Sequence, residues 1–149
     1  AGKVSPEDEK KVFYQTNYWK TLELLPGVRD ALSQFRKRGY RILLFTSRPW
    51  KLTDENLKSI TRKWLKGYQI KYKSLTFDNK KSTRFFKAQD LKVKYFIEDD
   101  LEKAVKLCSV CKAVFLIDYK YNQSDSKTPY NLIRVKNMSE IVKLIDLLD

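Results

Sequence analysis

Short apolar runs alternate with helical segments along this chain, and this alternation constrains the fold more than any other feature. Residues 40–46 form an apolar, β-prone run directly after Gly39, short enough for a buried strand. Before that glycine, Val28, Ala31, Leu32 and Phe35 recur at helical spacing. A helix, a glycine and a buried strand in this order are typical of parallel α/β proteins.

The same reading continues to the C-terminus. We expect helices over residues 6–25, 28–38, 52–65, 82–91, 101–108 and 139–148, and strands over residues 40–46, 72–77, 94–98, 113–118 and 132–135. The predicted fold class is α/β, a three-layer sandwich around a mainly parallel sheet. At 149 residues, 42% of them hydrophobic, the chain is expected to form a single domain over residues 1–149.

Composition excludes several classes of function. The sequence contains no histidine, which removes imidazole-based catalysis and zinc sites with a His ligand. No apolar run approaches the roughly 18 residues that span a bilayer, and the first ten residues hold no apolar core of a signal peptide. We therefore expect no membrane partner and a cytoplasmic location.

The two cysteines form a lone Cys-x-x-Cys pair, Cys108 and Cys111. A structural zinc site needs four ligands, and the chain offers no second pair. The pair follows a predicted helix, where the dipole does not favour a thiolate. We expect buried, reduced thiols of a cytoplasmic protein.

The net charge of +13 lies in the middle of the chain. Residues 36–94 contain eighteen basic and four acidic residues, whereas the flanking segments are nearly balanced. Such a surplus attracts phosphate groups, on a small molecule or on a nucleic acid. The alternative is a solvated face that keeps the protein soluble.

Polar residues follow the predicted strand over residues 40–46. Ligands of open parallel sheets bind beyond the carboxyl ends of the strands, and Thr46, Ser47 and Arg48 occupy that position. The Thr46 hydroxyl and the next two backbone amides suit a phosphate oxygen, and Arg48 adds a charge-assisted contact. The alternative is an ordinary turn before Pro49.

Three acids, Glu98, Asp99 and Asp100, follow the strand over residues 94–98, and Asp118 ends the next one. Clustered carboxylates suit magnesium, which takes one or two of them and keeps several waters. Alternatively, Asp99 or Asp100 caps the helix that begins at Leu101.

Several short motifs in order along the chain carry a family resemblance. They are Leu-Pro-Gly-Val at residues 25–28, Phe-Thr-Ser-Arg-Pro at 45–49, Asn-Lys-Lys at 79–81, Phe-Ile-Glu-Asp at 96–99 and Ile-Asp-Tyr at 117–119. In this order they resemble the haloacid dehalogenase (HAD) superfamily, particularly its small nucleotidase-like phosphatases.

The resemblance implies a role for each matching residue. Thr46 falls on the residue that hydrogen-bonds the transferring phosphoryl group. Lys81, or Lys80 if the register slips by one, falls on the neutralising lysine, and Glu98 and Asp99 fall on the acids that hold Mg²⁺. Phosphoryl transfer depends on positioning and charge neutralisation, so these assignments need no histidine.

The first motif of that family, Asp-x-Asp at the end of the opening strand, does not occur in the sequence. The resemblance therefore implies a HAD-like Rossmannoid fold without its usual first strand and without the nucleophilic aspartate. Three interpretations stay open: an upstream segment supplies the strand, another chain supplies it, or the protein is a noncatalytic relative. In the first two the protein is a HAD-type phosphatase; in the third it is not an enzyme.

Two functions follow. The first is a Mg²⁺-dependent phosphomonoesterase core, nucleotidase-like and not catalytically self-sufficient, with a small phosphate ester as its ligand. The second is a noncatalytic module that binds nucleic acid or an acidic protein through residues 36–94, where aromatic residues lie between the basic ones. Trp64, at helical spacing from Leu57 and Ile60, is expected to pack in the core instead.

Overall fold

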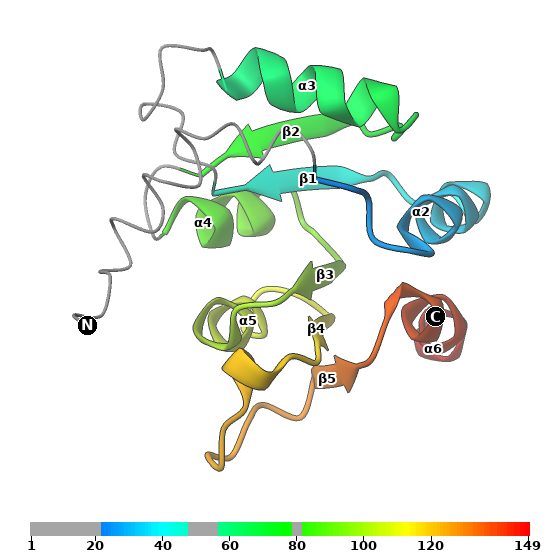
Figure 1. The fold of residues 1–149 in the computed structure, drawn as a ribbon. Coiled ribbons are helices and arrows are strands. Elements are labelled where there is room, and N and C mark those ends of the chain that lie inside the picture. The colour runs from blue at the N-terminus through cyan, green and yellow to red at the C-terminus, as the bar shows by residue number, and fades with distance from the viewer. Residues whose placement is uncertain (1–21, 48–56, 79–81) are drawn as a thin grey trace, which may run out of the picture. The chain divides into compact units, whose positions relative to one another are not determined.

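The computed structural model describes residues 22–47, 57–78 and 82–149 (Figure 1). The chain divides into two compact units, residues 1–79 and 80–149. Most of the helix predicted over residues 6–25 lies outside the described residues, as do Arg48, Lys80 and Lys81.

The end of that predicted helix requires a correction. Residues 22–25 are irregular. Pro26 disfavours helical geometry in the residue before it, and the Leu22 carbonyl accepts hydrogen bonds from Trp64 Nε1 at 2.8 Å and from the Tyr68 hydroxyl at 3.4 Å. Trp64 is thus half-buried rather than part of the buried core, where the sequence predicts it.

Helix α2, Val28–Lys37, lies between two glycines with left-handed backbone. Gly27 has φ of 80° and Gly39 has φ of 88°, a region that costs an L side chain free energy. Ala31 and Phe35 form its buried face. The predicted helix is confirmed, and Gly39 ends it by donating its amide to the Arg36 carbonyl at 2.9 Å.

Strands β1, Leu43–Thr46, and β2, Ser74–Phe77, form a parallel pair in which Leu43 lies opposite Ser74 and Thr46 opposite Phe77. The predicted strand over residues 40–46 begins three residues later than expected and is half-buried rather than buried. Among the described residues β1 has one strand neighbour, which leaves its other edge without a ladder.

Helix α3, Leu57–Gly67, runs alongside this strand pair (Figure 1). Lys58 Nζ and the Arg62 guanidinium lie 5.5 and 5.7 Å from the centre of the Phe77 ring. These cation–π contacts stabilise the packing of α3 against β2. Buried apolar side chains complete the core of this unit: Ala31, Phe35, Ile42, Leu65 and Ile70.

The second unit contains a three-stranded parallel sheet in the order β3-β4-β5. Its strands are β3 (Tyr95–Glu98), β4 (Ala113–Ile117) and β5 (Leu132–Val135). Four of the five β4 residues are buried, because β4 has a strand on both sides. Within the described part of the chain, β3 pairs with β4 alone.

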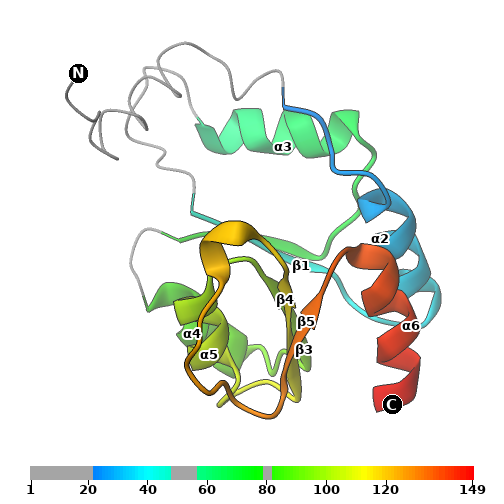
Figure 2. The ribbon, with the colours of Figure 1, turned by 60° about the horizontal axis from the view of Figure 1, so that its bottom comes forward.

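Helices cover both faces of this sheet. Figure 2 shows α4 (Thr83–Asp90) and α5 (Leu101–Leu107) on one side and α6 (Met138–Leu148) on the other. Asn137 caps α6 by accepting from the Glu140 amide at 3.1 Å. This helix–sheet–helix arrangement of parallel strands confirms the predicted fold class. Among the described residues, no helix is long and apolar enough to cross a bilayer.

Cys108 and Cys111 follow α5, and both are buried and free, as predicted. Burial, together with the neighbouring Cys108 thiol, raises the pKa of the Cys111 thiol to about 11. A thiol with so high a pKa is a poor nucleophile at neutral pH, so the pair has the character of core residues.

Candidate functional site

The described site residues lie at the carboxyl ends of two strands, one in each unit. Thr46 is the last residue of β1, and Ser47 follows it. The Thr46 carbonyl accepts the Asp78 amide at 2.7 Å, which extends the pairing of β1 with β2 by one residue. Glu98 ends β3, and Asp99 follows it. The joining of these two strand ends into one site stays a prediction, because they belong to different units.

Glu98 is a buried acid, only 5% exposed. It pairs with Arg84 of helix α4: Arg84 Nη1 donates to Glu98 Oε2, and the two side chains are 11% and 3% exposed. A buried carboxylate requires such compensation, because removal of a charge from water costs several kcal/mol. Arg84 thus supplies the positive charge at the end of β3.

The second oxygen of Glu98 is also committed. Glu98 Oε1 accepts the backbone amides of Asp99 at 3.0 Å and Asp100 at 3.2 Å. Burial raises the pKa of Glu98, while Arg84 partly offsets this effect. The side chain holds the turn after β3 in place.

Asp99 lies at the surface and accepts a hydrogen bond from the Tyr121 hydroxyl at 2.7 Å. Burial acts to raise its pKa, but the hydrogen bond from Tyr121 and the other local interactions outweigh it, and the net shift is downward. Burial and the hydrogen bond to Asp99 raise the pKa of Tyr121 in turn. Asp99 is therefore a stable carboxylate at neutral pH.

Asp100 has the capping role that the sequence left open. Its Oδ1 accepts the Lys103 amide at 3.0 Å, at the first turn of α5. Of the three acids, one is paired with an arginine, one is bound by a tyrosine, and one caps a helix.

A buried asparagine joins the end of β3 to the end of β4. Asn122, 3% exposed, donates through Nδ2 to the carbonyls of Asp99 at 2.8 Å and Ile117 at 2.7 Å. Its Oδ1 accepts from the Tyr119 amide at 3.2 Å and from Arg134 Nη1 at 3.0 Å. Asn122 belongs to a short 3-10 helix, Lys120–Asn122, and fixes where Asp99 leaves the sheet.

The segment after β4 also positions Asp118 and the tyrosine beside it. Asp118 Oδ1 accepts from Gln123 Nε2 at 2.7 Å and from Arg134 Nη1 at 3.0 Å, and these bonds lower its pKa. The rings of Tyr119 and Tyr121 stack with centres 5.1 Å apart and 12° between their planes. Through the hydroxyl of Tyr121 this stacked pair reaches Asp99.

These contacts decide whether Glu98 and Asp99 fit a magnesium ion. Mg²⁺ demands oxygen ligands in near-octahedral geometry, whereas both Glu98 oxygens are engaged by Arg84 and by backbone amides. Across residues 22–47, 57–78 and 82–149, no cluster of three or more acids or cysteines could hold a metal ion. In this arrangement the pair does not fit the metal site that the resemblance implies.

Sequence reasoning missed Arg84, Tyr121 and Asn122. Arg84 is three residues after Lys81 in the sequence, and a cation in the first turn of a predicted helix was the available signal. Tyr121 and Asn122 lie in a stretch with no periodic pattern, so no local signal marks them.

Comparison with known proteins identifies the fold of the chain. No family model matches the chain, and no curated protein matches its sequence. Among solved structures, the D,D-heptose 1.7-bisphosphate phosphatase of B. bronchiseptica, a HAD-family protein crystallised with magnesium and phosphate, superposes with a TM-score of 0.64 over 84% of each chain at 12% sequence identity. The chain has a HAD-like fold. At this identity the likeness concerns the fold alone, and it confirms the HAD-like Rossmannoid architecture predicted from the sequence.

Proposed function

We propose that this chain is a HAD-like phosphohydrolase core that binds a small phosphate ester beyond the carboxyl ends of β1 and β3. Thr46 and the amides of Ser47 and Arg48 hold the phosphoryl oxygens. Lys81, or Lys80, neutralises their charge. The observation that carries the proposal is the HAD-like fold, with Thr46 at the end of β1 and the Glu98–Asp99 pair at the end of β3.

The proposed chemistry is binding and charge neutralisation. Hydroxyls, amides and cations stabilise a phosphoryl group, but covalent transfer also requires an attacking group. The 149 residues contain no Asp-x-Asp. The chain is therefore proposed to act as a phosphatase only with a nucleophilic strand supplied upstream or by another chain.

Magnesium is not part of the proposed binding step. The structural relative was crystallised with magnesium and phosphate, but here Arg84 compensates the charge of Glu98. We propose that phosphate binding by this chain is independent of Mg²⁺. A cytoplasmic location belongs to the same proposal.

Replacement of Thr46 tests the phosphate site. Thr46→Val removes the hydroxyl and keeps the β-branched shape, so binding of inorganic phosphate is expected to weaken roughly tenfold, as for loss of one charge-assisted hydrogen bond. Thr46→Ser is the matched control and should bind as the wild type does. Equal phosphate affinity in Thr46→Val and wild type would remove Thr46 from the site.

A second candidate function is nucleic-acid binding through residues 36–94. One exposed aromatic favours it: Phe86 on α4 is 56% exposed and packs edge-on against Phe85, with 5.4 Å between ring centres. Base stacking on such a ring contributes about 1–3 kcal/mol per base. Phe86→Ala should then weaken oligouridylate binding, and the affinity should fall steeply with salt; a flat salt response would rule this function out.

A further inference from the structure

A pocket of about 420 Å³ lies in the first unit between helix α2 and residues 69–71, the turn between α3 and β2. Thr46 ends β1 at its carboxyl end, whereas the pocket is formed by segments that precede β1 and β2. The two sites therefore lie at opposite ends of these parallel strands.

Three cations line this pocket: Arg29 and Arg36 of α2, and Lys71. None of the lining residues is acidic. Among the described residues, these three side chains have no ion pair and no hydrogen-bond acceptor. Three unpaired positive charges around one concave surface produce a strongly positive local field.

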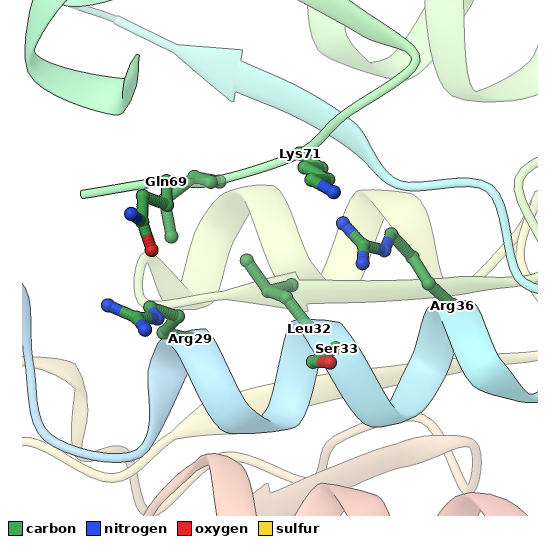
Figure 3. A pocket seen from close by; sticks show the side chains of 7 residues that line it. Arg29, Leu32, Ser33, Arg36, Gln69 and Lys71 are labelled. Carbon is green, nitrogen blue, oxygen red and sulfur yellow. The ribbon is translucent and has the colours of Figure 1, made fainter. Parts of the chain in front are cut away.

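Figure 3 shows how these side chains are arranged. Arg36 and Lys71 extend toward one another at one end of the pocket, and Arg29 and Gln69 lie at the other end. Leu32 stands between the two ends and presents an apolar surface. Like charges that approach each other in this way repel, and an anion placed between them converts the repulsion into two attractive contacts.

The helix dipole explains the position of only one of the two arginines in α2. Arg36 is in the last turn of α2, where a cation suits the helix dipole. Arg29 is in the first turn, at the positive end of the helix, where the dipole disfavours it. The dipole therefore does not account for its position, whereas Arg29 gives the pocket a second cationic end.

The spacing of the two arginines defines the ligand. Seven residues along an α-helix correspond to a rise of about 10 Å, which leaves room for a sugar-sized body between Arg29 and Arg36. Ser33 and Gln69 add hydrogen-bonding groups to the pocket, and its volume is typical of small-molecule sites. The lining contains no aromatic ring, the usual platform for single-stranded nucleic acid.

We propose that this pocket binds a small organic molecule with two phosphate groups, one held by Arg36 and Lys71 and the other by Arg29. Ser33 and Gln69 hydrogen-bond the body of the ligand, which lies over Leu32. This site is separate from the phosphate site at the ends of β1 and β3.

Isothermal titration calorimetry with fructose 1,6-bisphosphate as the probe tests the proposal on the full chain. We expect saturable binding, with fructose 6-phosphate at least about tenfold weaker because it engages one end only. Arg36→Gln and Lys71→Gln, on opposite walls, should each weaken the bisphosphate roughly tenfold. Far-UV circular dichroism verifies folding, and if one variant fails to fold, the other carries the test.

Two controls separate this site from a general charge effect and from the candidate site. Lys37→Gln removes the same charge from an exposed position of α2 outside the pocket and should leave bisphosphate binding within about twofold. Thr46→Val separates the two sites, because the binding step that Arg36→Gln and Lys71→Gln weaken should not depend on the Thr46 hydroxyl, whereas binding of a phosphate ester at the proposed site beyond β1 should.

Three results would overturn the proposal. They are no saturable binding of the bisphosphate, equal weakening by Lys37→Gln and Arg36→Gln, or displacement of the bisphosphate by oligouridylate at lower concentration. The last result would assign the pocket to a nucleic-acid backbone.

Discussion

The charge of Glu98 determines what the end of β3 can do. Its carboxylate is buried, and Arg84 and two backbone amides satisfy it. The positive charge that compensates Glu98 at the end of β3 thus comes from Arg84. We expect the same two residues to affect both the stability of the protein and the proposed phosphate site.

Removal of Arg84 should expose this dependence. Arg84→Met leaves a buried charge uncompensated and is expected to lower the free energy of unfolding by about 3 kcal/mol in urea denaturation. Lys87→Met, on the exposed side of the same helix, should cost less than about 0.5 kcal/mol. Addition of Glu98→Gln to Arg84→Met should recover most of the loss, because Gln keeps an acceptor for the two amides. A loss below about 1 kcal/mol in Arg84→Met would show that the pair is not buried.

Cys111 should react slowly with thiol reagents. Because burial holds its pKa at about 11, only about one molecule in a thousand carries the thiolate at pH 8. In Cys108→Ser, Cys111 is the remaining thiol and burial, the larger cause of its raised pKa, is kept. The alkylation rate at pH 8 should lie far below that of a free cysteine and rise with increasing pH. A rate equal to that of a model thiol would show an exposed Cys111.

At the scale of elements, the spacing of apolar residues predicted the helices and strands whose buried faces those residues form. Val28 to Phe35 repeat on one face between two glycines, and both helix ends follow from that pattern. The strand over residues 113–118 was equally clear, because a central parallel strand is apolar on both faces. The start of β1 was predicted three residues early, since Tyr40 and Arg41 continue its β-prone composition without joining the ladder.

The candidate site was less predictable than the fold. Strand-end positions for Thr46, Glu98 and Asp99 follow from the order of elements. The partner of Glu98 does not, because the facing of Arg84 on α4 depends on how that helix packs. The role of Asn122 could not be predicted for the same reason. Its four hydrogen bonds join segments that only the folded sheet brings together.

Asn122 should be the residue on which the edge beyond β3 and β4 most depends. Asn122→Ala strips hydrogen bonds from two carbonyls, one amide and Arg134, and is expected to cost roughly 3 kcal/mol of unfolding free energy. Lys127→Ala, in the exposed loop that follows, should be neutral within about 0.5 kcal/mol. Amide hydrogen exchange of Tyr119 should accelerate in Asn122→Ala; unchanged exchange and stability would contradict the role assigned to this side chain.

At the scale of the whole molecule, the single-domain prediction concerns the cooperation of the two units. All three tryptophans lie within residues 1–79, so their fluorescence reports on one unit, while far-UV circular dichroism reports on both. One domain predicts coincident urea transitions by the two probes. Transitions with different midpoints would show two units that unfold independently.

The central claim is the proposed binding of phosphate by residues at the carboxyl ends of β1 and β3. The most direct test is an NMR titration of inorganic phosphate into ¹⁵N-labelled protein, with and without magnesium chloride. The account predicts that the amides of Ser47 and Asp99 shift together, fit a single dissociation constant and respond in the same way without magnesium. A shift of only one of these amides, or of neither until magnesium is added, would contradict it.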